Sequence, residues 1–285
     1  MTNVETVGIA GAGTMGSGIA HVFARAGMRV ILCDVEKNLL DRALSQIHAN
    51  LGREAAKGKL AEGEVDAAVG RIVPTTDHDA LSGADMAIEA ATERFELKAD
   101  LFRRLDRILR VGAILATNTS SISITKLAAQ TRRPAQVIGM HFFNPVPVMA
   151  LVEVIRGLAT DDATYDLVQG LALRLGKTPV AVNDAPGFVS NRVLMPLINE
   201  AAYAVMEGVA TPEAVDQVFK LGMAHPMGPL TLADFIGLDV CVDILRVLHD
   251  GLGDPKYRPC PLLVRMVDAG WLGRKSRRGF YSYET

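Results

Sequence analysis

One apolar stretch, HFFNPVPVMALVEVI at residues 141–155, contains two side chains suited to acid–base chemistry. His141 opens the stretch, and Glu153 lies in its second, strand-like part, beyond an Asn-Pro-Val-Pro turn. An imidazole titrates near neutral pH, and a buried carboxylate is costly unless it is paired. If the chain doubles back at the turn, Glu153 comes level with His141, fixes its tautomer and stabilises its imidazolium form. The stretch therefore predicts a histidine–glutamate pair that acts as a general base.

The other potentially reactive side chains lack such a context. An isolated histidine is best interpreted as structural, and we apply this interpretation to His21, His48, His78, His225 and His249. The three cysteines are far apart and show no metal-ligand or redox spacing. We expect small core thiols and no metal site from Cys33, Cys241 and Cys260.

A glycine-rich segment near the start of the chain predicts a dinucleotide-binding loop. Its pattern is G-x-G-x-x-G, formed by Gly11, Ala12, Gly13, Thr14, Met15 and Gly16. The segment lies between a predicted strand and a predicted helix, and the next strand ends in Asp34, which is the context this fingerprint requires. The helix N-terminus offers N–H groups to phosphates. Asp34 would accept hydrogen bonds from ribose hydroxyls and repel a 2′-phosphate, so we expect NAD rather than NADP. The alternative is a glycine turn that binds no ligand.

Apolar strands alternate with amphipathic helices in the first part of the chain. The strand-like runs span residues 6–11, 29–34, 84–90, 112–118, 136–142, 149–157 and 177–184. Helical patterns span residues 15–27, where Gly27 closes the helix, 95–109 and about 161–176. This alternation predicts an α/β fold, a Rossmann-type doubly wound and mostly parallel sheet. Ligands of such sheets lie at the carboxyl edge, where His141 ends its strand.

After Asp184 helical patterns take over, and no strand pattern returns before the tail FYSYET. They cover residues 187–208, 211–222, 229–250 and 261–269. We place a domain boundary at 183–186, which gives a nucleotide-binding domain (1–184) and a C-terminal all-helical domain (185–285). These helices are apolar on more than one face, so we expect a homodimer through the helical domain.

The composition excludes several classes of protein. The 285 residues carry 30 Lys and Arg against 32 Asp and Glu, a net charge of −2, which argues against a nucleic-acid partner. No apolar run approaches the length of a membrane span. The N-terminal residues enter a strand almost at once, so we expect neither a signal nor a transit peptide. We therefore expect a soluble, cytoplasmic protein.

The chain resembles the L-3-hydroxyacyl-CoA dehydrogenase family over nearly its whole length, and most of all its short bacterial 3-hydroxybutyryl-CoA dehydrogenases. The resemblance depends on seven segments in the family's order: GAGTMGSGIA, IEAATERFELK, TNTSS, HFFNPVPVMALVEVI, DAPGFVSNR, HPMGPLTLADFIGLD and LGRKSRRGFYSY. It implies reversible, NAD-dependent oxidation of (S)-3-hydroxyacyl-CoA, with a short acyl chain, to 3-ketoacyl-CoA. Such a reaction needs a base near neutrality, because the hydroxyl loses a proton while its carbon loses hydride.

The resemblance also implies roles for particular residues. His141 would be the catalytic base and Glu153 its partner, with Ser120 and Asn191 contacting the substrate. Besides the glycine loop and Asp34, the residues at NAD-contacting positions are Glu93, Lys98, Ser120, Asn144 and Lys275. The CoA portion of the substrate would contact Lys57, Ser120 and Asn50. Position 50 is usually a serine in longer relatives.

The residues alone leave alternatives open. Ser120 and Asn191 lie beside predicted element ends and could be caps, and Glu93 and Lys98 could be solvated charges. A dehydrogenase of a free hydroxy acid or sugar acid, or a non-catalytic NAD-binding protein, could share this architecture. Related dehydrogenases that use a lysine base at the start of the helical domain are disfavoured, because Asn191 and Arg192 stand there.

Overall fold

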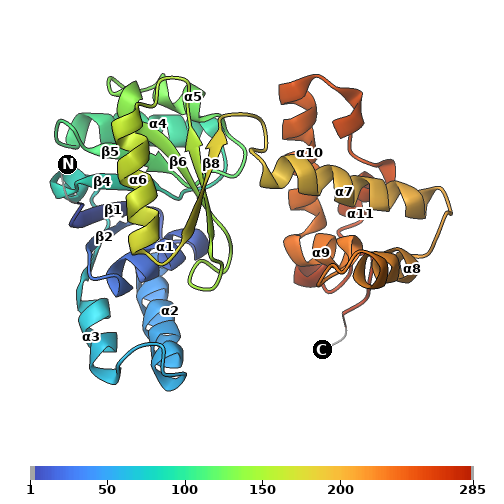
Figure 1. Ribbon diagram of the computed structural model, residues 1–285, viewed down its shortest axis with the longest axis horizontal. Coiled ribbons are helices and arrows are strands. Elements are labelled where there is room, and N and C mark those ends of the chain that lie inside the picture. Colours follow the sequence, from blue (N-terminus) through green and yellow to red (C-terminus); the bar gives the residue numbers. More distant parts are fainter. Residues whose placement is uncertain (1–3, 284–285) are drawn as a thin grey trace. The chain divides into compact units, whose positions relative to one another are not determined.

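The computed structural model describes residues 4–283 and divides into two compact units, one ending at Asp184 and the other beginning at Ala185 (Figure 1). We describe each unit by itself. Within residues 4–283, no helix has both the length and the apolar character needed to cross a membrane.

The first unit is built on an eight-stranded sheet with the order β3-β2-β1-β4-β5-β6-β7-β8. Its strands are β1 (Thr6–Ala10), β2 (Arg29–Cys33), β3 (Ile72–Thr75), β4 (Met86–Glu89), β5 (Ile114–Thr117), β6 (Val137–Phe142), β7 (Leu151–Arg156) and β8 (Thr178–Asn183). Neighbouring strands are parallel, apart from the antiparallel pair β6 and β7. The predicted doubly wound, mostly parallel sheet is confirmed.

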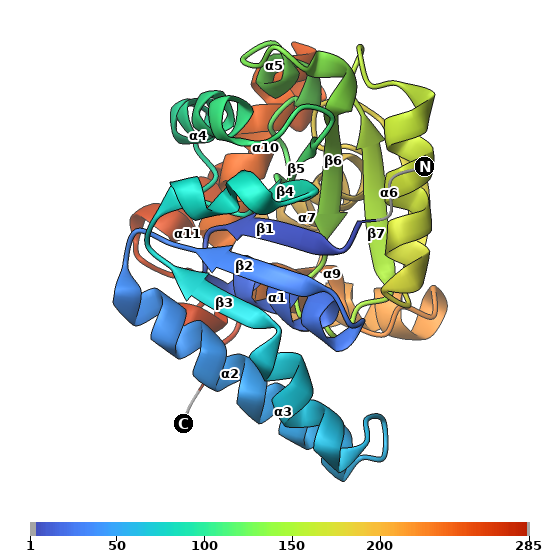
Figure 2. The same cartoon turned by 90° about the vertical axis from the view of Figure 1, so that its left-hand side faces the viewer.

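Helices cover both faces of this sheet, which explains why its central strands β4, β5 and β6 are buried along their whole length. They are α1 (Thr14–Arg25), α2 (Lys37–Ala56), α3 (Glu62–Gly70), α4 (Phe95–Ile108), α5 (Ile124–Ala128) and α6 (Asp162–Arg174), with 3₁₀ turns at His78–Gly83 and Pro134–Gln136. Figure 2 shows α4 and α6 on opposite sides of the strands. Gly27, predicted to close α1, follows its end with a φ of +87°.

Strand β3 corrects the sequence analysis, which predicts no strand between residues 34 and 84. Its four residues, Ile72–Thr75, pair in parallel with β2 at the edge of the sheet. The strand is short, is not apolar throughout and contains Pro74, which an edge strand tolerates. Because of these features, the sequence pattern does not predict the strand. The helices α2 and α3, which precede it, form a hairpin that projects away from the sheet (Figure 2).

The second unit is helical. Its helices are α7 (Ser190–Met206), α8 (Pro212–Gln217), the π-helical η3 (Val218–Gly222), α9 (Pro229–Ile236), α10 (Leu238–Leu252) and α11 (Pro261–Asp268), with 3₁₀ turns at Pro255–Tyr257 and Arg274–Ser276. The single helical pattern predicted over 229–250 is wrong in one respect. Gly237, with a φ of +107°, separates α9 from α10, because this conformation cannot continue a helix.

Candidate active site

His141 and Glu153 form a buried pair at one end of the sheet. Antiparallel pairing sets His141 of β6 directly opposite Glu153 of β7, so both side chains project from the same face. Nδ1 of His141 lies 2.7 Å from Oε2 of Glu153, and the two residues are 8% and 2% exposed. At this distance the carboxylate can accept a hydrogen bond from the Nδ1–H of the imidazole, which would fix its tautomer.

The turn between β6 and β7 is fixed by contacts with residues outside it. The ammonium of Lys177 donates to the carbonyl oxygens of Val146 and Met149, at 2.5 and 2.7 Å. Val146 also packs against Gly18 of α1, where an added Cβ would lie 2.9 Å from the Cβ of Val146. Burial lowers the pKa of Lys177. These contacts fix the return of the chain and hence the alignment of His141 with Glu153.

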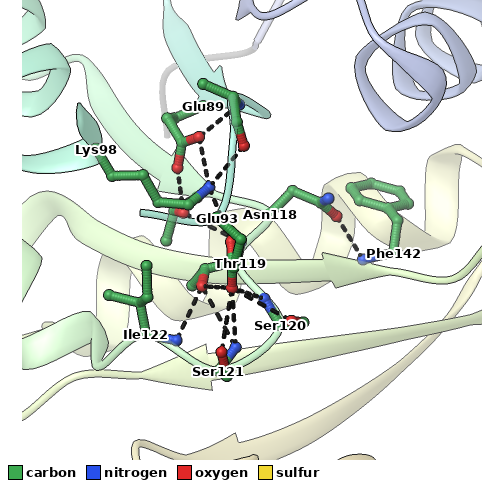
Figure 3. A network of polar contacts seen from close by, with 11 residues as sticks. Glu89, Glu93, Lys98, Asn118, Thr119, Ser120, Ser121, Ile122 and Phe142 are labelled. Atoms are coloured by element: carbon green, nitrogen blue, oxygen red, sulfur yellow. Dashed lines mark hydrogen bonds and ion pairs between the residues drawn. The ribbon is translucent and has the colours of Figure 1, made fainter. Parts of the chain in front are cut away.

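A loop after β5 gathers several polar side chains beside this end of the sheet (Figure 3). Oε1 of Glu93 accepts hydrogen bonds from the hydroxyl of Thr119, at 2.5 Å, and from the backbone N–H of Ser120, at 2.8 Å. The hydroxyl of Ser120 is also 3.2 Å from this oxygen. Asn118 accepts a bond from the N–H of Phe142, so the loop is attached next to His141. The structure thus brings Ser120 and Glu93, two of the predicted site residues, into contact.

Lys98 is not the solvated charge that the sequence allows as an alternative. Its side chain is 1% exposed, and its ammonium lies 2.7 Å from Oε1 of Glu89 and 3.1 Å from Oε2 of Glu93 (Figure 3). Glu89, which ends β4, is fully buried and was not selected from the sequence. A lone carboxylate closing an apolar strand is the signal that also marks Asp34, and it could have identified Glu89.

The glycine loop has the space and the dipole that a dinucleotide pyrophosphate needs. Gly11 has a φ of +113°, and a Cβ on Gly16 would lie 1.8 Å from the carbonyl oxygen of Gly11, so both positions require glycine. A Cβ on Gly13 would meet nothing within 4 Å, which leaves room above the loop. The first turn of α1 contains no acidic residue, and no side chain caps it. Its N–H groups can therefore donate hydrogen bonds to phosphate oxygens, and the site fits NAD.

Asp34 lies where it can contact both the loop and an adenosine ribose. Its Oδ2 accepts a hydrogen bond from the N–H of Ala12, at 2.7 Å, and its Oδ1 from the N–H of Glu36, at 3.1 Å. Each carboxylate oxygen has a second lone pair for a ribose hydroxyl. Asp34, Gly13 and Ala90 line a cleft of about 300 Å³ beside the ends of β1 and β2.

A second cleft, of about 510 Å³, lies between α1, α2 and the turn after His141. Its lining includes Gly13, Gln46, Asn50 and Asn144. Asn50 accepts hydrogen bonds from Gln46 and Arg53, while Lys57 lies exposed at the C-terminal end of α2. Asn50 and Lys57 thus share one helix, and only Asn50 lines the cleft.

Two predicted site residues belong to the second unit. Asn191 lies in the first turn of α7, and Lys275 forms an ion pair with Asp239 at 2.6 Å. The three cysteines are buried, and burial raises the pKa of Cys33 to about 11 and that of Cys241 to about 12. They are inert core thiols, as the sequence predicts.

Family models and known relatives match nearly the whole chain. The model of the 3-hydroxyacyl-CoA dehydrogenase NAD-binding domain matches residues 6–185, and that of the C-terminal domain matches residues 187–283. A probable 3-hydroxybutyryl-CoA dehydrogenase of Bacillus subtilis is 57% identical over 99% of this chain and 98% of its own length. A 3-hydroxybutyryl-CoA dehydrogenase of Bradyrhizobium diazoefficiens is 52% identical over 98% and 96%. The crystal structure of an (S)-3-hydroxybutyryl-CoA dehydrogenase from Ralstonia eutropha superposes with a TM-score of 0.97, at 49% identity, over 99% of this chain and all of that one.

A Rossmann-type sheet with this glycine loop, followed by a helical domain, defines an NAD-dependent oxidoreductase. The chain belongs to the 3-hydroxyacyl-CoA dehydrogenase family. The resemblance noted in the sequence is therefore confirmed.

Proposed function

We propose that this enzyme reversibly oxidises (S)-3-hydroxybutyryl-CoA, and related short-chain (S)-3-hydroxyacyl-CoA thioesters, to the 3-ketoacyl-CoA with NAD. The observation that carries the proposal is the buried His141–Glu153 pair, placed at the end of a sheet that also bears the NAD loop. The substrate named for the similar proteins of Bacillus subtilis, Bradyrhizobium diazoefficiens and Ralstonia eutropha supports the choice of acyl chain.

In the proposed mechanism His141 is the general base. Its Nε2 takes the proton of the substrate hydroxyl, while Glu153 holds Nδ1 and stabilises the imidazolium that forms. Bound NAD⁺ would accept the hydride from the substrate carbon that carries this hydroxyl. In the reverse direction the imidazolium returns its proton to the ketone oxygen. Ser120 and Asn191 would contact the substrate, as the resemblance to the family implies.

We propose the glycine loop, Asp34, Glu93, Lys98, Ser120, Asn144 and Lys275 as the residues that hold NAD or shape its site. The CoA portion would follow α2, where Asn50 lines the larger cleft and Lys57 offers a positive charge to phosphate. Two features stay predictions: the pairing of two chains through the helical domain and the location in the cytoplasm.

The test is NADH consumption, followed by fluorescence, with three kinds of substrate: acetoacetyl-CoA, longer 3-ketoacyl-CoA thioesters and free acetoacetate. We expect acetoacetyl-CoA to be reduced fastest and free acetoacetate hardly at all. Faster turnover of the free acid would instead indicate a hydroxy-acid dehydrogenase. NADH binding without turnover of any substrate would indicate a non-catalytic NAD-binding protein.

A further inference from the structure

Glu89 and Lys98 form a charged pair sealed from solvent. Glu89 ends β4, Lys98 lies in the first turns of α4, and the two residues are 0% and 1% exposed. Burying two charges costs free energy that their attraction often does not recover, so such a pair is a weak source of stability. Its better-supported use is to fix one arrangement of the surrounding polar groups.

Lys98 connects two carboxylates that lie on different segments. An ammonium has three N–H donors, and that of Lys98 lies near three acceptors: Oε1 of Glu89 at 2.7 Å, the carbonyl oxygen of Ala91 at 3.1 Å and Oε2 of Glu93 at 3.1 Å. Burial would raise the pKa of Glu93, but Lys98, with the hydroxyl of Thr119 and the N–H of Ser120, outweighs burial and lowers it. Glu93 is therefore a charged acceptor, and such acceptors make stronger hydrogen bonds than neutral ones.

Two routes lead from Glu89 to the loop that carries Ser120, and Figure 3 labels the residues of the first, Lys98 and Glu93. Through Lys98, Glu89 holds Glu93, which binds the N–H of Ser120. Through its Oε2, Glu89 accepts the hydroxyl of Thr117 at 2.6 Å, and Thr117 accepts the N–H of Thr119 at 3.1 Å. The strand register places Glu89 directly beside Thr117, so the second route needs no flexible connection.

We propose that Glu89 is a positioning residue for the reaction. It fixes the loop of residues 117–121 from two sides, and so sets where Ser120 stands relative to the end of β6, which bears His141. Asn118 completes the connection, because it accepts the N–H of Phe142 at 2.9 Å. This inference rests on the proposed contact between Ser120 and the substrate.

The substitution Glu89→Gln tests this role, because it keeps the size of the side chain but replaces one acceptor oxygen with a donor. The amide nitrogen would face either Lys98, whose ammonium cannot accept a hydrogen bond, or Thr117, whose hydroxyl would then accept instead of donating; in both orientations Lys98 loses the negative charge of Glu89. We expect kcat/KM for acetoacetyl-CoA, measured at saturating NADH, to fall by about tenfold. Thr117→Val breaks the second route alone and should cause a smaller loss of the same kind.

A double-mutant cycle separates positioning from general stabilisation. If Glu89 acts through Ser120, Glu89→Gln should cost almost nothing in kcat/KM once Ser120→Ala is present, whereas independent effects would multiply. Asp106→Asn is the matched control, because Asp106 is a buried carboxylate of α4 that holds Arg132 and Arg133. It should lower Tm and leave kcat/KM unchanged.

The outcomes distinguish this inference from the proposed function. Wild-type kcat/KM in Ser120→Ala would overturn the substrate contact of Ser120, and with it the inference. A slow Ser120→Ala with a normal Glu89→Gln, or losses that multiply, would overturn the role of Glu89 alone. If Glu89→Gln does not fold, the same cycle with Thr117→Val decides: non-additive losses support the inference, and multiplying losses overturn it.

Discussion

Asp34 is a single residue with two tasks, and substitutions can separate them. Its carboxylate supports the N–H of Ala12 in the glycine loop, and we expect it to bind the adenosine ribose of NAD and to repel the 2′-phosphate of NADP. Asp34→Ala should weaken NADH binding and reduce the ratio by which the enzyme binds NADH more tightly than NADPH. Asp34→Asn keeps an acceptor for Ala12 and should narrow the preference with a smaller loss of NADH affinity. Kd values from fluorescence titration check both, and a wild type that prefers NADPH would contradict this role.

The His141–Glu153 pair leads to a second prediction at this scale. His141→Ala should lower kcat by roughly 10²- to 10⁴-fold while NADH still binds, because the imidazole serves the substrate hydroxyl. Glu153→Gln should also lower kcat strongly, since it removes the charge that stabilises the imidazolium. The control is His249→Asn, at a half-buried position of α10, with wild-type turnover expected. Steady-state kinetics of acetoacetyl-CoA reduction measure all three, and near-normal rates for the first two would make His141 a structural residue.

At the scale of elements, helices α1 and α2 meet at a buried histidine. His21 of α1 is fully buried, and its Nε2 lies 3.1 Å from Oε1 of Glu54 on α2. Burial is the largest influence and lowers the pKa of His21, aided by Arg25 and Lys177, although Glu54 acts in the opposite direction. The folded chain therefore favours the neutral imidazole.

This preference predicts how stability depends on pH. Below about pH 6.5 the unfolded chain takes up a proton on His21 that the folded chain takes up only at lower pH. The unfolded state then binds more protons, so the free energy of unfolding falls as the pH falls from about 6.5 toward the folded pKa. His21→Gln should make the decline in Tm between about pH 7 and 5.5 shallower. His48→Gln, on an exposed part of α2, should keep the wild-type decline, and parallel curves for wild type and His21→Gln would contradict the prediction.

The next prediction concerns the hairpin of α2 and α3, where we expect CoA to bind. Lys57 caps α2 and is exposed, so its attraction to a CoA phosphate is screened by salt over about 8 Å at physiological ionic strength. Lys57→Ala should raise KM for acetoacetyl-CoA, most clearly at low salt, with little change in kcat, which is the signature of lost uniform binding. Lys126→Ala, at an exposed position of α5, is the control. Lys57→Ala should not change KM for a thioester that lacks the nucleotide. Equal changes in KM for both substrates would contradict the assignment of Lys57 to the CoA site.

How far the sequence predicts these elements depends on how local their signals are. The glycine loop, and the pairing of His141 with Glu153, follow from short segments, because a strand, a turn and a returning strand lie within fifteen residues. The order of strands along the sheet and the edge strand β3 do not, because they depend on pairing between distant segments. Glu89 has a local signal, as the lone carboxylate at the end of an apolar strand, but its contacts are not local, because its partners Lys98 and Thr117 come from other elements.

At the scale of the whole molecule, the helical unit exposes several large apolar side chains. Its segment η3 and the following residue present Val218, Leu221 and Met223, which are 57%, 84% and 56% exposed. Large apolar side chains that are close together and exposed commonly mark an interface. A second copy of the chain is the partner we expect, since most oligomers are symmetric assemblies of identical chains.

Sedimentation equilibrium at micromolar concentration tests this pairing, and we expect twice the mass of one chain. The double substitution Leu221→Asp with Met223→Asp places two charges where the interface would bury them, and a buried unpaired charge is very costly. It should therefore yield a monomer. Leu158→Asp alters an equally exposed leucine of the first unit, 89% exposed, and should leave the dimer intact. A monomeric wild type would contradict the dimer, and a dimer that survives the double substitution would place the interface elsewhere on the chain.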